Sequence, residues 1–461
     1  MNNPDQQRHP SYILYLTTLV SFMTAFMGSS LNVALPIIGN DFHASATSLS
    51  WLSTIYLLTT ASLLIPIGKL SDIKGRNNIF KYGLIIFTTG SLLCGISQDT
   101  FQLMFFRSIQ GIGSSFLFAT STAILISAFP QNQRGKVLGI NTASVYTGLS
   151  SGPFLGGLIT QSISWRMIFY LNFFIGLFLI IVTFIILIEK ETTNESYDLK
   201  GSIFYSISII LMMIGLTFLP KFIGIVLLIT GSALLITFYK IEKVASHPVL
   251  NVNVFKSNKT FVFSNLAALI NYCATFAISF LLSFYLQIVK GLNPRDAGII
   301  LITQPVMQAF FSPLAGKLSD KVEPQIVASI GMGLLTVGLV ILCFLNPLTQ
   351  FYFIIINLFL LGIGFALFSS PNVNAIMSSV DRKYYGVASS TTASMRVIGQ
   401  TFSMGVVTMI FRMFIGDSKI TANNQLDFLI SLRIAFIIFS VLSFTGIFFS
   451  ISRGSIHKKI D

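Results

Sequence analysis

The chain has 461 residues, of which 53% are hydrophobic and only 10% are charged, whereas a soluble globular domain carries roughly 25% charged residues. This composition excludes a soluble enzyme. The formal net charge of +13 comes from basic residues scattered singly among apolar segments, which indicates a role in membrane topology and not a nucleic-acid surface.

Apolar segments of about twenty residues recur along nearly the whole chain, and each can cross a hydrocarbon core of about 30 Å. They are predicted to be helices, because a backbone in lipid must satisfy its own hydrogen bonds and the alternation of a β-barrel is absent. The first run continues to Pro36 without a small-residue cleavage site, so we expect a retained span and not a signal peptide. In chain order we predict fourteen spans, at residues 13–37, 48–70, 79–97, 102–127, 137–161, 165–188, 201–220, 222–241, 259–288, 296–316, 326–345, 352–378, 385–415 and 431–452.

The basic residues predict how these spans are oriented. An even number of spans places both ends of the chain on one side of the membrane, and most of the 29 Lys and Arg residues lie on that side. Because cytoplasmic loops carry the excess of basic residues, both termini are predicted to be cytoplasmic in a multi-pass protein of the cell membrane. The loop after the second span alone contains Lys69, Lys74, Arg76 and Lys81.

The two ends of the chain also repeat each other weakly. Residues 68–72 after the second span read Gly-Lys-Leu-Ser-Asp, and the same five residues recur at 316–320 after the tenth span, at an offset of 248. This agreement predicts two homologous six-span halves with two spans inserted between them. Further glycine pairs share an offset of 251 residues, namely Gly111 and Gly362, Gly113 and Gly364, Gly135 and Gly386, and Gly148 and Gly399.

The predicted fold is therefore an all-α membrane protein of two six-helix bundles plus two inserted helices. Residues 1–190 form the N-terminal six-span half, residues 191–257 contain the inserted two-span hairpin and its linkers, and residues 258–461 form the C-terminal six-span half. Parallel repeats of this kind normally enclose a midplane cavity whose access alternates as the halves rock.

The loop after the second span combines two glycines, which let helix ends turn sharply, with an acid that can accept hydrogen bonds from a helix N-terminus or an arginine. Its sequence, Gly-Lys-Leu-Ser-Asp-Ile-Lys-Gly-Arg at 68–76, resembles the major facilitator signature Gly-x-Leu-Ala-Asp-Arg-x-Gly-Arg, with Ile73 where a basic residue is usual. The resemblance implies a major facilitator fold with a conformational latch at this loop, although an ordinary basic loop is the alternative. The predicted latch residues are Gly68, Asp72, Gly75, Arg76 and Asp320.

Later segments of the chain make the family resemblance more specific and point to one branch of the family. Residues 107–113 read Arg-Ser-Ile-Gln-Gly-Ile-Gly and look like the fourth-span arginine motif of the family. Residues 148–157 read Gly-Leu-Ser-Ser-Gly-Pro-Phe-Leu-Gly-Gly and match the Gly-x-x-x-Gly-Pro-x-x-Gly-Gly pattern of its antiporters. Residues 247–250 and 292–298 resemble the fourteen-span drug:proton antiporter branch, which includes quaternary-ammonium and multidrug exporters.

The fifth-span pattern also has a direct physical use. Glycines four residues apart place a smooth groove on one helix face, so that a neighbouring helix can approach closely, and Pro153 permits a bend. This suits a helix that slides between the halves, although static close packing would produce the same pattern. The predicted antiporter motif consists of Gly148, Gly152, Pro153, Gly156 and Gly157.

Charged residues inside the spans are rare. Arg107 lies a few residues into the fourth span, where a charge costs about 2.5–3.5 kcal/mol, so it either has a function or reaches the outer headgroups; Arg396 in the thirteenth span is a weaker case. None of the 16 acidic residues is predicted to lie in the middle of a span. By resemblance, Arg107 would influence proton movement. Because no acid lies in the middle of a span and no histidine lies in the membrane, the acids that remain for proton coupling are Asp296, Asp41 and Asp72, with Asp296 and Asp41 as the predicted coupling residues. An uncoupled facilitator, or coupling to another ion, remains open.

The substrate cavity is predicted to be aromatic and without acidic residues. The first-span aspartate usual in this branch is replaced by Met27, so a buried dication would find no countercharge. Neutral, monocationic or anionic amphiphiles could bind through contact area and stacking. The predicted cavity residues are Met27, Tyr146, Asn271, Tyr272, Gln287, Gln304 and Asn374.

These patterns predict a secondary active efflux transporter for small hydrophobic or amphiphilic compounds that works by alternating access, with the proton gradient implied by the resemblance. The alternatives are a dedicated exporter or facilitator of one endogenous lipid or metabolite, and a non-transporting sensor. No nucleophile constellation or phosphate loop is evident and the three cysteines lie far apart, so no enzyme, metal site or cofactor is predicted. The expected partners are substrate, protons and the lipid bilayer, without nucleic acid or an ATPase subunit.

Overall fold

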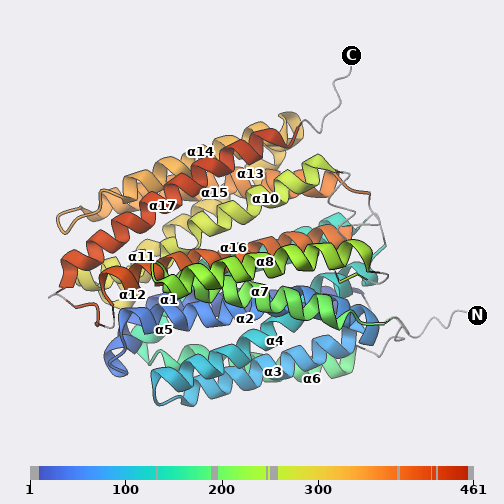
Figure 1. Ribbon diagram of the computed structural model, residues 1–461, viewed down its shortest axis with the longest axis horizontal. Helices are drawn as coiled ribbons and strands as arrows, with labels where there is room; N and C mark the ends of the chain where they lie inside the picture. The colour runs from blue at the N-terminus through green and yellow to red at the C-terminus, as the bar shows by residue number, and fades with distance from the viewer. Residues whose placement is uncertain are drawn as a thin grey trace, which may run out of the picture.

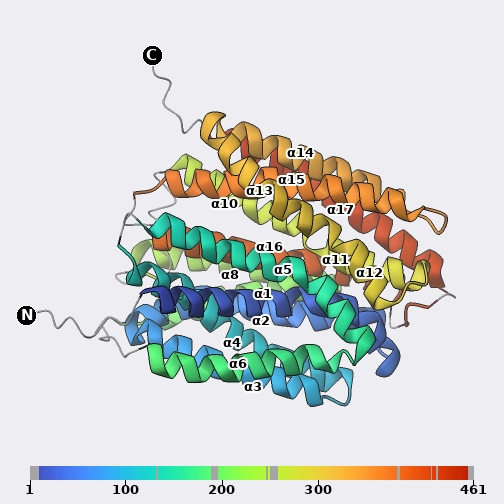
Figure 2. The same cartoon turned by 180° about the vertical axis from the view of Figure 1, so that it is seen from behind.

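The structure is a computed structural model in which long helices run side by side along the longest axis of the molecule (Figure 1). Both ends of the described chain lie at one end of the molecule, in the front and rear views alike (Figures 1 and 2). We call this the terminal end, and the opposite one the far end. The structure describes residues 10–130, 133–187, 196–245, 248–249, 258–381, 385–416, 418–421 and 424–454.

Thirteen helices in the described part of the chain are long and apolar enough to cross a membrane. One more, α5 (Arg134–Ser162), is 29 residues long and packs among them, but its glycines lower its hydropathy. The described ranges therefore hold fourteen spanning helices, and the predicted all-α fold is confirmed. The first bundle consists of α1 (Pro10–Asp41), α2 (Ala46–Lys74), α3 (Arg76–Ile96), α4 (Thr100–Ala128), α5 and α6 (Arg166–Ile186).

The second bundle contains two spans that are made of consecutive helical segments. Its first span is α10 (Lys259–Thr275), continued by α11 (Ala277–Phe284) and the π-helical turn η2 (Tyr285–Val289), and its second is α12 (Pro294–Leu301), continued by α13 (Thr303–Lys321). The remaining spans of this bundle are α14 (Pro324–Leu342), α15 (Phe351–Ser378), α16 (Tyr385–Phe414) and α17 (Gln425–Ser452).

Polar side chains cap the N-termini of several of these helices, where each accepts a hydrogen bond from a free backbone N–H group. Asp99 caps α4, and Asn258 caps α10. Asn293 caps α12 and is followed by Pro294, which has no N–H to satisfy at the first helical position. The loop residues that separate the apolar segments therefore determine where the spans start.

The two bundles pack their helices in the same order, so the sequence repeat corresponds to a repeat in the structure. α5 packs against α1 as α16 packs against α10, and α4 contacts α2 and α3 as α15 contacts α13 and α14. A side-chain carbon added at Gly148 would lie 2.5 Å from the carbonyl oxygen of Phe22, and one added at Gly399 would lie 2.6 Å from that of Leu269. Glycines 251 residues apart thus occupy equivalent positions of close helix approach.

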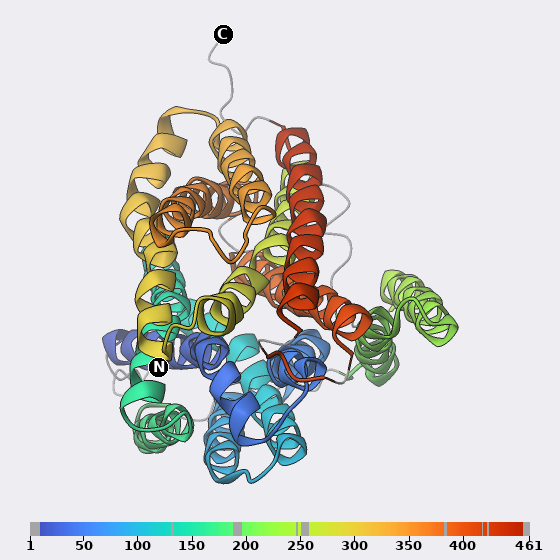
Figure 3. The same ribbon diagram turned by 90° about the vertical axis from the view of Figure 1, so that its left-hand side faces the viewer.

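The inserted helices α7 (Leu199–Phe218) and α8 (Phe222–Val244) form a hairpin on the outside of the molecule (Figure 3). α7 contacts α2 and α16, one helix from each bundle, and the Tyr205 hydroxyl donates to the carbonyl oxygen of Ala61 at 3.0 Å. The predicted domain limits at residues 190, 191 and 257 lie outside the described residues, so these limits stay a prediction.

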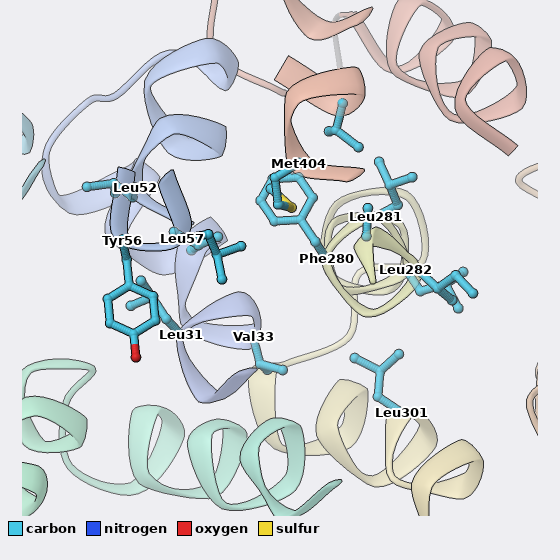
Figure 4. Close-up of a cluster of buried hydrophobic side chains, with 14 of the residues drawn as sticks. Leu31, Val33, Leu52, Tyr56, Leu57, Phe280, Leu281, Leu282, Leu301 and Met404 are labelled. Atoms are coloured by element: carbon cyan, nitrogen blue, oxygen red, sulfur yellow. The ribbon is translucent and has the colours of Figure 1, made fainter. Parts of the chain in front are cut away.

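The hydrophobic core extends across the interface between the bundles. Figure 4 shows side chains of α1 and α2 facing side chains of α11, α12 and α16 in one cluster. Since a continuous apolar core links the two bundles, they are packed together in this structure. The labelled members are Leu31, Val33, Leu52, Tyr56 and Leu57 on one side and Phe280, Leu281, Leu282, Leu301 and Met404 on the other.

Candidate functional site

Hydrogen bonds between the two bundles close the far end of their interface. One of them runs from Gln287 Nε2 in η2 to the carbonyl oxygen of Val33 in α1 at 2.9 Å, and the same amide nitrogen donates to Ser283 Oγ at 2.9 Å. At the rim, bonds join Ala46 N to Ser418 O (3.0 Å), Thr47 Oγ1 to Gly416 O (2.9 Å) and Lys419 Nζ to His43 Nδ1 (2.9 Å).

Three spaces follow each other along the interface. A far-end vestibule of about 460 Å³ is lined by Gly39, Leu49, Gln287, Asn293 and Lys419 among others. A midplane pocket of about 100 Å³ is lined by residues that include Asn32, Tyr146, Tyr272, Gln304, Gln308 and Gln400. A terminal-side pocket of about 60 Å³ is lined by residues that include Ser121, Asn141, Tyr146, Tyr272, Thr392 and Arg396. In the described part of the chain, no aspartate or glutamate lines any of the three.

One hydrogen bond between the bundles separates the midplane pocket from the terminal-side pocket. The hydroxyl groups of Tyr146 in α5 and Tyr272 in α10 lie 2.8 Å apart, and both residues line both pockets. On the other side, Asn32 lines the midplane pocket and Pro36 lines the vestibule, with the bonded carbonyl of Val33 between them along α1. The midplane pocket therefore lies between two polar contacts, each contributed by both bundles.

The predicted antiporter motif lies where α5 approaches helices of both bundles. A side-chain carbon at Gly156 would lie 2.5 Å from the carbonyl oxygen of Ser30 in α1, and Gly148 and Gly152 also face α1. Gly157 instead contacts the carbonyl oxygen of Pro294 in α12, across the bundle interface.

The reciprocal contact across this interface also involves a glycine. A side-chain carbon at Gly298 in α12 would lie 2.6 Å from the carbonyl oxygen of Pro153. Pro153 itself lines the midplane pocket. Small residues thus permit backbone contact both within the first bundle and between the bundles.

The predicted latch residues lie at the terminal ends of α2 and α13. Asp72 forms an exposed ion pair with Arg76 at 2.7 Å, and Gly75 separates α2 from α3 with a φ of +91°, a conformation that favours glycine. Gly68 lies one helical turn before Asp72 and has open space beside it. In the second bundle, the Asn374 side-chain amide donates to Asp320 Oδ1 at 3.3 Å, so the two loops differ in their contacts.

Arg107 is buried in α4 and is fully engaged by the first bundle. Its Nε donates to the carbonyl oxygen of Leu52 at 3.2 Å, its NH1 group donates to Gln110 Oε1 at 2.6 Å, and its guanidinium lies 4.3 Å from the Tyr56 ring centroid. It does not reach solvent at the headgroups, since it is 1% exposed. Gln110 was not among the predicted site residues, although its spacing of three residues places it on the same helix face as Arg107.

The structure does not gather the three predicted proton-coupling residues into one cluster. Asp41 accepts a hydrogen bond from Trp165 Nε1 at 2.7 Å at the far end of α1. Asp296 accepts one from Asn293 Nδ2 at 2.9 Å in the first turn of α12. Each of these acids and Arg107 thus has its own partners.

The predicted cavity residues fall in four different places. Tyr146, Tyr272 and Gln304 line the midplane pocket, and Gln287 lines the vestibule. Met27 and Asn271 are buried in the helix packing and line none of the three spaces, and Asn374 lies with Asp320 at the terminal end. Gln308 and Gln400 also line the midplane pocket and were not among the predicted cavity residues, although an amide within an apolar span is a signal that could have found them.

A known protein family matches most of the chain. The profile of the Major Facilitator Superfamily matches residues 17–404 and 264–460. The riboflavin transporter RibZ of Clostridioides difficile (strain 630) is 31% identical over 418 residues, which cover 90% of this chain and 90% of that protein. The multidrug resistance protein Stp of Mycobacterium tuberculosis (strain ATCC 25618 / H37Rv) is 28% identical over 408 residues, covering 86% of this chain and 74% of Stp.

Solved structures show the same fold at low sequence identity. A bacterial homolog of the human lysosomal transporter Spinster, crystallised in an inward-facing and unoccupied conformation, superposes with a TM-score of 0.68 at 15% identity. The match covers 98% of each chain.

Proposed function

The chain belongs to the Major Facilitator Superfamily, and from this membership we propose that it is a secondary active efflux transporter for small hydrophobic or amphiphilic compounds. The observation that carries the proposal is the midplane pocket between two polar contacts, Tyr146 with Tyr272 on the terminal side and Gln287 with Val33 on the far side. Breaking one contact while the other holds would open the pocket to one end only, which is the requirement for alternating access.

Proton-coupled antiport is part of this proposal and is supported by the glycine and proline motif of α5. The described pockets contain no carboxylate, so we assign proton exchange to acids near the far end, Asp41 and Asp296. The basic residues near the terminal end support a cytoplasmic location of both termini in the cell membrane. Export would then run from the terminal end to the far end.

A narrower substrate is a second candidate. RibZ, a relative over most of the chain, is named as a riboflavin transporter. The amides of Gln304, Gln308 and Gln400 line the midplane pocket and offer donors and acceptors to a planar heteroaromatic ring, and aromatic side chains offer stacking surfaces. Transport of riboflavin or a related heterocycle is therefore the alternative to broad export.

Transport in proteoliposomes tests these proposals. We expect movement of a hydrophobic dye into vesicles that contain the purified protein, faster when a pH gradient is imposed, and no movement into empty vesicles. Riboflavin added as a competitor distinguishes the two candidates, because a dedicated riboflavin transporter would be saturated by it at low concentration. A transport rate that does not change when the pH gradient is imposed would refute proton coupling. Absence of any transport would refute export.

A reversible cross-link tests alternating access directly. Ala46 N and Ser418 O are hydrogen-bonded at the far rim, so Ala46→Cys with Ser418→Cys on a background without the native cysteines can form a disulfide between the bundles. Oxidation should stop transport and reduction should restore it. A single-cysteine variant, Ala46→Cys alone, is the matched control and should not respond to oxidation. Unimpaired transport by the cross-linked protein would contradict the mechanism.

A further inference from the structure

Arg396 in α16 is a cation that faces the pathway without an ionic partner. It lines the terminal-side pocket and a smaller space of about 20 Å³ beside Tyr56 and Phe118. Its guanidinium carbon lies 5.5 Å from the Phe118 ring centroid. Among the described residues, no carboxylate forms an ion pair with it.

Arg107, which is buried and 1% exposed, shows what a structural arginine looks like in this protein, whereas Arg396 is only half-buried. Arg107 donates to a carbonyl oxygen and to an amide oxygen, and it lines none of the pockets described above. Arg396 has an aromatic contact and no hydrogen bond to any other described residue, so its N–H donors are available to the pocket. Anchoring by local hydrogen bonds explains Arg107 but does not explain Arg396.

A second donor in the same pocket is held in place by the first bundle. Ser21 Oγ donates to Asn141 Oδ1 at 2.9 Å. This bond fixes the Asn141 amide with its NH₂ group directed away from Ser21. In the described part of the chain this NH₂ group has no acceptor, although Asn141 is 7% exposed and lines the terminal-side pocket. An NH₂ group can only donate, so it adds to the demand for an acceptor in the pocket.

The rest of the lining has the same chemical character. Hydroxyl groups of serine, threonine and tyrosine supply further hydrogen-bonding groups, and no acid is among the lining residues. A guanidinium beside neutral donors matches a carboxylate, sulfonate or phosphate oxygen, because hydrogen bonds between ionised partners are the strong ones. A cationic ligand group would instead meet an unshielded positive charge.

We propose that the terminal-side pocket binds the acidic group of an organic anion, with Arg396 as its countercharge and Asn141 as a second donor. This inference rests on the proposed transport function and names its substrate class. The pocket, at about 60 Å³, fits the acidic group alone. The apolar part of the molecule would extend into the midplane pocket when the hydrogen bond between Tyr146 and Tyr272 opens.

Binding of three matched naphthalene compounds tests the proposal. The probes are 1-naphthoate, which is anionic, 1-naphthamide, which is neutral, and 1-naphthylmethylammonium, which is cationic. Equilibrium dialysis with the purified full-length protein should show the tightest binding for 1-naphthoate. In Arg396→Gln its affinity should fall by at least about tenfold, equivalent to about 1.4 kcal/mol, while 1-naphthamide binding stays within about twofold.

Two variants distinguish the effect of the positive charge at Arg396 from a general loss of structure. Arg396→Lys keeps the positive charge and should retain most of the affinity for 1-naphthoate. Arg412→Gln removes an arginine from the same helix that also lies over a phenylalanine, Phe218 at 3.9 Å, but lines none of the described pockets. It should bind all three probes as the unmodified protein does.

The outcomes distinguish the substrate class from the transport function. Equal binding of the anionic and neutral probes, or an equal loss of both in Arg396→Gln, would overturn the anion site even if the dye is exported. Selective binding of 1-naphthoate that depends on Arg396 would support the site, and its uptake into proteoliposomes then tests whether the bound anion is moved. Binding of 1-naphthoate with uptake of neither this anion nor the dye would leave the anion site standing and refute the transporter function.

Discussion

At the residue scale, backbone contacts at α5 show why side-chain size matters more than polarity at several positions. Gly157 lies against the carbonyl oxygen of Pro294, and Pro153 supplies its own carbonyl oxygen to the space beside Gly298. Because these contacts join the two bundles, a side chain there would hold the bundles apart. Elsewhere on α5, Gly139 has open space beside it.

Gly157→Val should therefore slow transport. Overpacking at a tight contact costs about 1–3 kcal/mol, and here that cost falls on the state in which the far end is closed. Gly139→Val on the same helix is the matched control and should transport at the normal rate. Efflux rates at equal expression provide the measurement, and equal rates for the two variants would contradict a role for the α5 contact.

Asp72→Asn should leave the protein folded but slow its cycle at least severalfold. The ion pair with Arg76 is exposed, and such pairs contribute only about 0–1 kcal/mol to stability, so the thermal unfolding midpoint should barely change. The predicted latch role concerns a contact made in another state of the cycle. Asp99→Asn, at the cap of α4, is a comparison variant outside the latch. Normal efflux by Asp72→Asn at equal expression would refute the latch.

At the element scale, the hairpin of α7 and α8 touches both bundles from outside while the pockets lie between the bundles. The residues that line the three spaces belong to the two bundles and their connecting loops, and none comes from α7 or α8. The contact of Gly405 in α16 with Met213 in α7 shows how closely the hairpin packs. This position suits a role in holding the bundles and not in binding substrate.

Substrate should therefore not protect cysteines placed on the hairpin. On a background without the native cysteines, Ile207→Cys and Ile229→Cys should react with a membrane-permeant thiol reagent at the same rate with and without substrate. Gln304→Cys, in the midplane pocket, is the positive control and should be shielded. Shielding at both hairpin positions would show that α7 and α8 border the pathway.

At the scale of the whole molecule, the charged side chains that line the pathway are positive. Arg396 lines the terminal-side pocket and Lys419 lines the vestibule, whereas no carboxylate lines the three spaces among the described residues. A divalent cation would have to lose its water without gaining a partner, at a cost of several kcal/mol per charge. Neutral compounds avoid this cost.

We therefore expect rigid dications to be poor substrates. Efflux of matched monocationic and dicationic compounds in proteoliposomes should differ by at least about tenfold in favour of the monocation, and a neutral analogue should move at least as fast. Fast transport of the dication by the unmodified protein would show that acids outside the described pockets supply the countercharge.

The sequence alone determined the helical membrane fold, the internal repeat and the family, because a bilayer requires apolar helices of fixed length and because the motifs are local. It did not determine which polar residues meet in the pathway. Arg107 and Arg396 both look like single arginines in apolar spans, yet one is bonded within its bundle and the other faces a pocket. Met27 was predicted to line the cavity because it stands where the resembled branch has a first-span aspartate, and in the structure it is fully buried in helix packing. Only the tertiary structure decides such cases, because the rotation and depth of a helix depend on contacts with helices that are distant in the chain, such as that of Arg107 with Leu52.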